Sequence, residues 1–165
     1  LPLISSALKD AGVTKTLSAV VFGEEGPRRD EGGVPIRFLG RLDDEGLRRA
    51  YSAADVMVVP SRLDNLPSTA VEAQSCGTPV VAFRIGGLPD IVDDRVTGAL
   101  AEPYDVSSLA DAATWVISDS ARQAQMGKAA RQRAIELWNP QKVAEQYLDV
   151  LEQAAREGKA MKGLG

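Results

Sequence analysis

The fold is decided by the segment Val56-Met57-Val58-Val59-Pro60-Ser61-Arg62-Leu63-Asp64-Asn65-Leu66-Pro67-Ser68-Thr69-Ala70-Val71-Glu72-Ala73. Its first four residues form an apolar run between Asp55 and Pro60, which predicts a strand buried on both faces. Turn-forming residues follow, and Ser68 is the expected N-cap of a helix that stops at Gly77. A helix that begins just past the carboxyl end of a parallel strand offers free N–H groups and a positive dipole end, which suit an anion such as a diphosphate.

Two carboxylates bracket this turn. Asp64 lies in the loop before the helix, and Glu72 lies about one turn inside it. Ionised carboxylates only accept hydrogen bonds, so such a pair suits vicinal hydroxyls, as in ribose or a hexose. The alternative is that Asp64 caps the loop and Glu72 is a solvated helix residue, and their spacing does not decide between the two.

Length and composition predict one globular domain. The chain has 165 residues, of which 44% are hydrophobic and 25% are charged. The formal net charge of -4 and a pI near 4.9 argue against a nucleic-acid-binding protein, which usually has a basic face. No apolar run approaches the length that spans a bilayer.

The chain has no histidine and a single cysteine, Cys76. A serine–histidine or cysteine–histidine nucleophile system within this chain is therefore excluded. We expect no metal site, and we expect Cys76 to be a small packing residue. The lone cysteine favours a reducing, cytoplasmic setting.

Segments that predict strands alternate with segments that predict helices. The expected strands are residues 17–22, 35–39, 56–59, 79–83 and 97–101, and the expected helices are residues 1–10, 43–54, 69–75, 106–117 and 120–137 and a last one from residue 140. The charged segment Glu24 to Gly33 is expected to be a mobile loop. This order is typical of an α/β fold: a Rossmann-like parallel sheet with helices on both faces, closed by C-terminal helices. We assign residues 1–157 to this domain and residues 158–165 to a tail.

Ligands of such sheets bind beyond the carboxyl ends of the strands. The loops expected there are residues 23–29, 40–42, 61–68 and 84–89. Gly86-Gly87 marks a turn that needs either positive φ or a close backbone approach. The chain contains neither a GxGxxG dinucleotide loop nor a GxxxxGK[ST] phosphate loop, which counts against a dehydrogenase or an NTPase.

Several further motifs occur in order along the chain. They are Pro60-Ser61, Asp64 with seven residues before Glu72-Ala73, Cys76-Gly77-Thr78-Pro79-Val80-Val81-Ala82, Gly86-Gly87-Leu88-Pro89-Asp90-Ile91-Val92 and Thr97-Gly98. Together they resemble the C-terminal, donor-binding domain of the family-4 (group 1) glycosyltransferases, from about Leu1 to about Leu151. The resemblance implies a GT-B fold, in which two Rossmann-like domains enclose the active site. It further implies a metal-independent, retaining transfer from a UDP- or GDP-linked sugar, with an N-terminal acceptor-binding domain as partner.

The resemblance also implies roles for individual residues. Asp64 would face the hydroxyls of the donor sugar as the catalytic carboxylate, and Glu72 would hold the ribose hydroxyls. Backbone N–H groups near Asn65, Leu66 and Ser68 would meet the diphosphate, and Gly40 and Arg41 would lie along the base.

The chain departs from the family pattern in three ways. Asp64 stands where the family usually has glutamate, and Pro67, which lacks an N–H, interrupts the usual glycine-rich turn. The Asn65-Leu66-Pro67 variant resembles members that act on surface polysaccharides, which suggests polysaccharide or glycolipid biosynthesis. The resemblance implies that the family's diphosphate-neutralising Arg and Lys would precede Leu1, so we expect little or no transferase activity and weak donor binding from this chain alone.

Two other functions stay open on the sequence. One is a GT-B nucleotide-sugar epimerase, and the other is a non-catalytic carbohydrate-binding domain. Arg41 is as readily a solvated arginine as a ligand contact. The basic stretch with Lys128, Arg131 and Arg133 is a solvated helix face or, in the full-length protein, a peripheral membrane contact.

Overall fold

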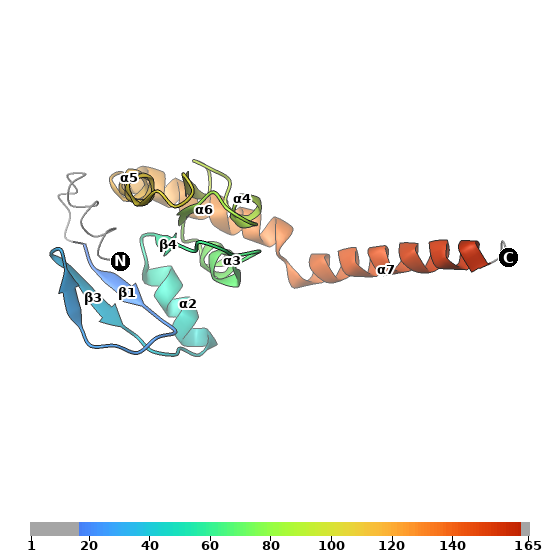
Figure 1. Cartoon of the computed structure of the whole chain (residues 1–165), viewed down its shortest axis with the longest axis horizontal. Coiled ribbons are helices and arrows are strands. Elements are labelled where there is room, and N and C mark those ends of the chain that lie inside the picture. The colour runs from blue at the N-terminus through green and yellow to red at the C-terminus, as the bar shows by residue number, and fades with distance from the viewer. Residues whose placement is uncertain (1–16, 163–165) are drawn as a thin grey trace.

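The computed structural model of the chain describes residues 17–162. The helix expected at residues 1–10 lies outside the described residues. The elements are β1 (Ala19–Val21), β2 (Arg29–Glu31), β3 (Val34–Phe38), α2 (Asp44–Ala53), β4 (Met57–Val59), α3 (Ser68–Ser75), β5 (Val80–Phe83), α4 (Leu88–Ile91), β6 (Gly98–Ala101), α5 (Val106–Ile117), α6 (Ser120–Leu137) and α7 (Pro140–Lys162) (Figure 1). The predicted α/β class is confirmed, and the expected strands and helices within the described residues occur in the predicted order, with β2 and α4 in addition.

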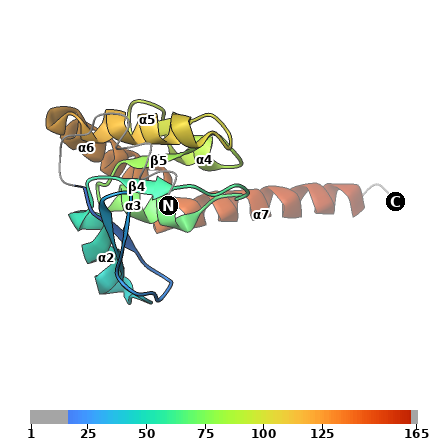
Figure 2. The same cartoon turned by 60° about the vertical axis from the view of Figure 1, so that its left-hand side comes forward.

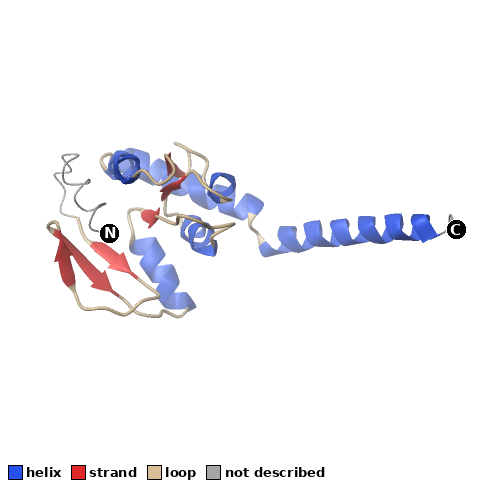
Figure 3. Cartoon of the chain, viewed as in Figure 1, coloured by secondary structure: helices blue, strands red, loops and turns tan. Residues whose placement is uncertain are grey.

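The strands divide between two three-stranded sheets (Figure 3). In one sheet β4, β5 and β6 are all parallel, in the order β4-β5-β6. In the other, β3 lies between β1, which is parallel to it, and β2, which is antiparallel. The predicted parallel sheet is confirmed for β4, β5 and β6, but the strands expected at residues 17–22 and 35–39 lie in the other sheet. The alternation of strands and helices does not specify which strands are neighbours.

The prediction of a mobile loop over residues 24–33 is wrong in part, because Arg29–Glu31 form the strand β2. Gly32 and Gly33 connect β2 to β3 as a two-residue hairpin, with φ of 64° and 81°. Two consecutive residues with positive φ are what a type I′ turn requires, and glycine adopts them without steric cost. The strand itself is Arg-Asp-Glu, so its charged composition hides it from a search for apolar runs.

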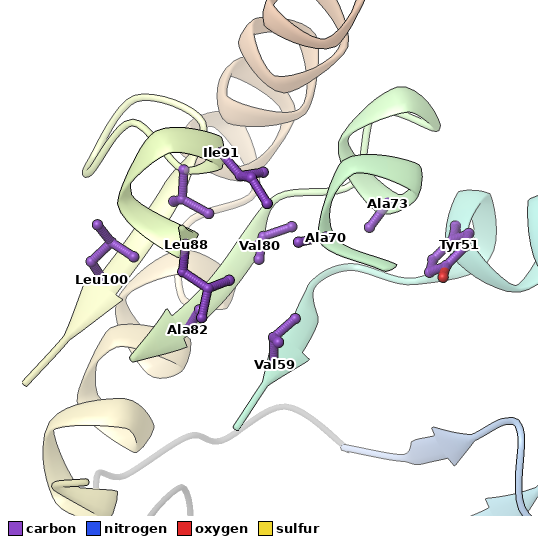
Figure 4. Packing of buried hydrophobic residues seen from close by; sticks show 10 residues of the cluster. Tyr51, Val59, Ala70, Ala73, Val80, Ala82, Leu88, Ile91 and Leu100 are labelled. Carbon is purple, nitrogen blue, oxygen red and sulfur yellow. The ribbon is translucent and has the colours of Figure 1, made fainter. Parts of the chain in front are cut away.

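Helices cover both faces of the parallel sheet, as predicted (Figure 2). One face of β5 and β6 packs against α5 and α6 through Val81, Phe83, Ala99 and Ala101. On the other face a cluster joins α2, α3 and α4 to the sheet (Figure 4). Its members are Tyr51, Val59, Ala70, Ala73, Val80, Ala82, Leu88, Ile91, Val92 and Leu100. Alternate residues of a strand point to opposite faces, which explains this division.

The edge strand β4 departs from the prediction. All residues of β5 and β6 are buried, whereas Val56, Met57 and Val58 are only half-buried and Val59 alone is buried. The prediction that the whole run is buried on both faces is therefore wrong. Within the described residues β4 pairs only with β5, and an edge strand keeps one side uncovered.

The last two helices differ in how they meet the domain. α6 lies close against the turn after α3, since a Cβ on Gly127 would come within 2.4 Å of the Gly77 carbonyl oxygen. Arg131 donates to the carbonyl of Ser75, and Arg133 donates to those of Asp90 and Ile91. This basic stretch thus anchors α6 through two of its three cations.

The helix α7 projects away from the domain and continues to Lys162, past the residue where we place the start of the tail (Figure 1). No helix in the described part of the chain has the length and apolar composition needed to cross a membrane.

Candidate functional site

The loop between β4 and α3 leads to the helix start at which the sequence predicts an anion site. Pro67 is the N-cap of α3, with φ of -66° and ψ of 116°, and Ser68 is the first helical residue. The prediction of Ser68 as N-cap is wrong by one residue. Because the pyrrolidine ring already fixes φ, Pro67 takes the extended cap conformation at little cost.

The amino end of α3 has no side-chain cap, which distinguishes it from the longer helices. The carboxylates of Asp43, Asp105 and Asp119 accept from backbone N–H groups at the starts of α2, α5 and α6. Pro67 has no side-chain acceptor, so within residues 17–162 the first N–H groups of α3 have no side-chain partner. They remain available, with the positive dipole end, for a bound anion.

Gly86 and Gly87 lie directly against the backbone of the loop that contains Asp64. A Cβ on Gly86 would lie 1.8 Å from the Asp64 carbonyl oxygen, and one on Gly87 would lie 2.0 Å from that of Asn65. Gly86 also has a φ of 51°. The predicted positive φ and the predicted close approach are both confirmed, and the approaching group is the Asp64-Asn65 backbone.

The Asp64 side chain is half-buried, and within the described residues its carboxylate has no hydrogen bond or ion pair. The neighbouring Arg62 forms no ion pair with Asp64 in this structure. Its guanidinium lies over the ring of Tyr104 instead, 5.7 Å from the ring centroid. Arg84, in the next loop, forms an ion pair with Asp94 at 2.7 Å. Asp64 therefore keeps its acceptor capacity for a ligand.

Glu72 is exposed, and one of its oxygens is held. The Tyr51 hydroxyl donates to Glu72 Oε2 at 3.0 Å. Burial is the main cause that raises the pKa of Tyr51 well above its ordinary value, and the hydrogen bond to Glu72 and its charge add to the shift. We predicted Tyr51 only as part of an apolar helix face. A buried tyrosine hydroxyl needs a partner, but only the tertiary structure identifies Glu72.

Gly40 and Arg41 lie beyond β3. The Gly23 N–H donates to the Gly40 carbonyl at 2.7 Å, and Gly40 has a φ of 64°. Beside them is an open hollow of about 570 Å³, lined by Glu25, Gly26, Phe38, Leu39 and Gly40. Arg41 is exposed, and no ion pair to it occurs in residues 17–157.

The predicted site residues thus fall into two groups. Asp64, Asn65, Leu66 and Ser68 gather at the start of α3, with Glu72 one turn further on. Gly40 and Arg41 follow β3 of the other sheet, and among the described residues no hydrogen bond or ion pair joins them directly to Asp64 or Glu72. An indirect link exists, since the ring of Phe22, next to Gly23, packs edge-on against Tyr51.

Comparison with known proteins identifies the family. Residues 31–133 match the family described as glycosyl transferases group 1, so the chain belongs to this family. The D-inositol 3-phosphate glycosyltransferase of Saccharomonospora viridis is 39% identical over 118 residues, which are 72% of this chain and 27% of that protein. The protein of the same name from Corynebacterium kroppenstedtii is 39% identical over 132 residues, 79% of this chain and 29% of its own length. The chain therefore spans less than a third of these relatives.

Solved structures agree with this assignment. Sucrose-phosphate synthase from Thermosynechococcus elongatus superimposes with a TM-score of 0.77 at 30% identity, over 94% of this chain and 43% of that one. Anabaena HepE, solved in complex with UDP, gives a TM-score of 0.66 at 27% identity, over 72% of this chain and 32% of that one. The C-terminal domain of a group 1 glycosyltransferase from Francisella tularensis shares the fold, with a TM-score of 0.69 at 24% identity, over 84% of this chain and 78% of that one. The resemblance to group 1 glycosyltransferases of GT-B fold is confirmed.

Proposed function

We propose that this chain is the donor-binding domain of a glycosyltransferase that transfers a sugar from a nucleotide sugar, with retention of configuration and without a metal. One observation carries the proposal. The start of α3, which has no side-chain cap, lies between two carboxylates. Among the described residues Asp64 has no hydrogen-bond or ion-pair partner, and Glu72 is held by one oxygen only.

The proposed donor position follows from this geometry. The diphosphate lies at the first N–H groups of α3, where the helix dipole and the N–H donors near Asn65, Leu66 and Ser68 stabilise its charge. Glu72 accepts hydrogen bonds from the ribose hydroxyls. Asp64 accepts from the hydroxyls of the sugar, and Gly40 and Arg41 lie along the base, beside the hollow at Phe38.

The proposed reaction is driven by charge stabilisation at the leaving group. When the bond from the sugar to the diphosphate breaks, negative charge grows on the departing phosphate oxygen. Backbone donors already aimed at that position stabilise this charge without reorganising. Asp64, fixed through its backbone against Gly86, holds the sugar while the acceptor attacks.

The donor is a UDP- or GDP-linked sugar in this proposal, and the UDP complex of HepE favours UDP. We place the acceptor in polysaccharide or glycolipid biosynthesis in the cytoplasm, with an N-terminal acceptor-binding domain as partner. The names of the relatives favour a different acceptor, a phosphorylated polyol or sugar. A peripheral membrane contact finds less support, because Arg131 and Arg133 are engaged in holding α6.

The test is a calorimetric titration of the chain with UDP, GDP and ADP and their glucose conjugates. We expect one nucleotide to bind, and we expect Glu72→Ala to weaken that binding by about tenfold or more, since bonds to a charged group are lost. Glu145→Ala, on the exposed face of α7, is the matched control and should leave affinity unchanged. Binding that Glu72→Ala does not affect would show that the ribose role is wrong. A chain that binds no nucleotide would contradict the donor-binding function.

A further inference from the structure

We propose that Tyr51 is a positioning residue for Glu72, which it holds by one carboxylate oxygen so that the other accepts from the ribose. This inference rests on the proposed function. In this inference Tyr51 does not contact the nucleotide, but it affects nucleotide binding through Glu72.

The Tyr51 side chain has a fixed position in the core. It is 3% exposed, and Figure 4 shows it on α2 at the edge of the buried cluster, facing α3 beside Ala73. The Phe22 ring packs against it edge-on, with centroids 5.4 Å apart and planes at 84°. A ring confined in this way presents its hydroxyl at one place only.

The backbone of Tyr51 is held as well. Its carbonyl accepts from Thr78 Oγ1 at 2.6 Å and from the Ala54 N–H at 3.0 Å. Thr78 follows α3 and is itself 2% exposed, so this bond joins the end of α2 to the far end of the helix that carries Glu72. The position of the Tyr51 hydroxyl relative to the Glu72 carboxylate is therefore fixed by the packing of the Tyr51 ring and by the bond from Thr78 to the Tyr51 backbone.

Glu72, by contrast, has no second hydrogen bond or ion pair at its carboxylate among the described residues. It is exposed, and in the described residues the Tyr51 hydroxyl is the only hydrogen-bond donor to its carboxylate. A free glutamate side chain loses much rotamer entropy when a ligand fixes it. A carboxylate offers about four acceptor positions on its two oxygens, so one bond from Tyr51 orders the group and leaves capacity for a diol.

The Tyr51 hydroxyl keeps the proton that it donates to Glu72. The pKa of Tyr51 is raised, first by burial and then by Glu72, so the phenol keeps its proton throughout the neutral range. An ionised carboxylate has no proton to donate, so the Tyr51 hydroxyl is the donor in this pair. Because the acceptor is charged, the bond is charge-assisted.

The experiment uses the complete 165-residue chain and two ligands, UDP and 2′,3′-dideoxy-UDP, which differ only in the ribose hydroxyls. The ratio of their dissociation constants measures ribose recognition. We expect Tyr51→Phe to reduce the preference for UDP by about tenfold, the effect of one charge-assisted hydrogen bond, and to change affinity for the dideoxy compound little. Tyr147→Phe, the same change on an exposed residue of α7, is the control.

Each outcome decides the question. Lost preference in Tyr51→Phe, with a thermal midpoint and circular dichroism close to wild type, supports the inference. An undiminished preference overturns it and leaves the proposed function standing. A wild type that does not distinguish the two ligands overturns the ribose role of Glu72 and the inference with it.

A second variant covers the case in which Tyr51→Phe does not fold. Thr78→Val removes the bond to the Tyr51 carbonyl and keeps the hydroxyl. We expect a smaller reduction of the same preference, and an unchanged preference would overturn the inference.

Discussion

Gly86 supports the Asp64 loop because it has no side chain. Alanine there would need a φ of 51° and would place Cβ 1.8 Å from the Asp64 carbonyl oxygen. We expect Gly86→Ala to lower the free energy of unfolding by about 3 kcal/mol or more, combining backbone strain with overpacking. Urea denaturation measures this change.

Gly23 provides the control for that experiment. It has a φ of 85°, but a Cβ there would meet nothing within 4 Å. Gly23→Ala should cost about 1 kcal/mol, from backbone strain alone. Equal losses in the two variants would mean that the close approach of the Asp64 carbonyl to Gly86 adds nothing to the cost of the substitution.

Ionisation of Tyr51 is expected to lower the free energy of unfolding at alkaline pH. Its folded pKa lies above the unfolded value of 10.0, so its contribution is complete below pH 10 and is lost as pH rises toward the folded pKa. We expect the free energy of unfolding to fall more steeply between pH 9.5 and pH 11.5 (about the range of tyrosine ionisation) in wild type than in Tyr51→Phe. Urea denaturation across that range gives both slopes, and parallel slopes would refute the prediction.

Single residues also mark the limits of sequence interpretation. The turn chemistry around Pro67 and Ser68 correctly predicted where α3 begins, to within one residue. The identity of the cap depended on which residue took the extended conformation. Similarly, the helical period placed Tyr51 on the buried face of α2, but the partner of its hydroxyl comes from another helix, 21 residues further along the chain.

At the scale of elements, α5 and α7 show opposite relations to the core. Leu109 of α5 is fully buried against β5 and β6. Leu148 of α7 is 59% exposed, like its neighbours Tyr147, Val150 and Leu151, and only Val143 is partly buried among the described side chains of α7. The apolar period that predicts both helices therefore says nothing about whether a partner covers them.

The same substitution in both helices tests this difference. Leu109→Ala should lower the free energy of unfolding by about 2–5 kcal/mol, because it leaves a cavity in the core. Leu148→Ala should change it by less than about 0.5 kcal/mol, as for other surface positions. The measurement is urea denaturation of the complete chain. A large loss in Leu148→Ala would mean that α7 packs against something in solution.

At the scale of the whole molecule, we expect the chain alone to transfer no sugar at a detectable rate. It spans 27% of a curated relative, and two cations of its described site loops are engaged with other side chains. Arg62 lies over Tyr104, and Arg84 is paired with Asp94. Mass spectrometry of products from UDP-glucose with inositol phosphate and sugar phosphate acceptors is the measurement, and any transfer product absent from a Glu72→Ala control would contradict the prediction.

The sequence by itself determined the family, the α/β order and the placing of Asp64 and Glu72 around one helix start. These depend on local signals: apolar runs, turn residues and short motifs at fixed spacing. Only the tertiary structure decided that the strands form two sheets, that the Asp64 loop rests on Gly86-Gly87 and that Tyr51 holds Glu72. Each of these joins residues distant in the chain, and such contacts depend on how elements pack, which local composition does not specify.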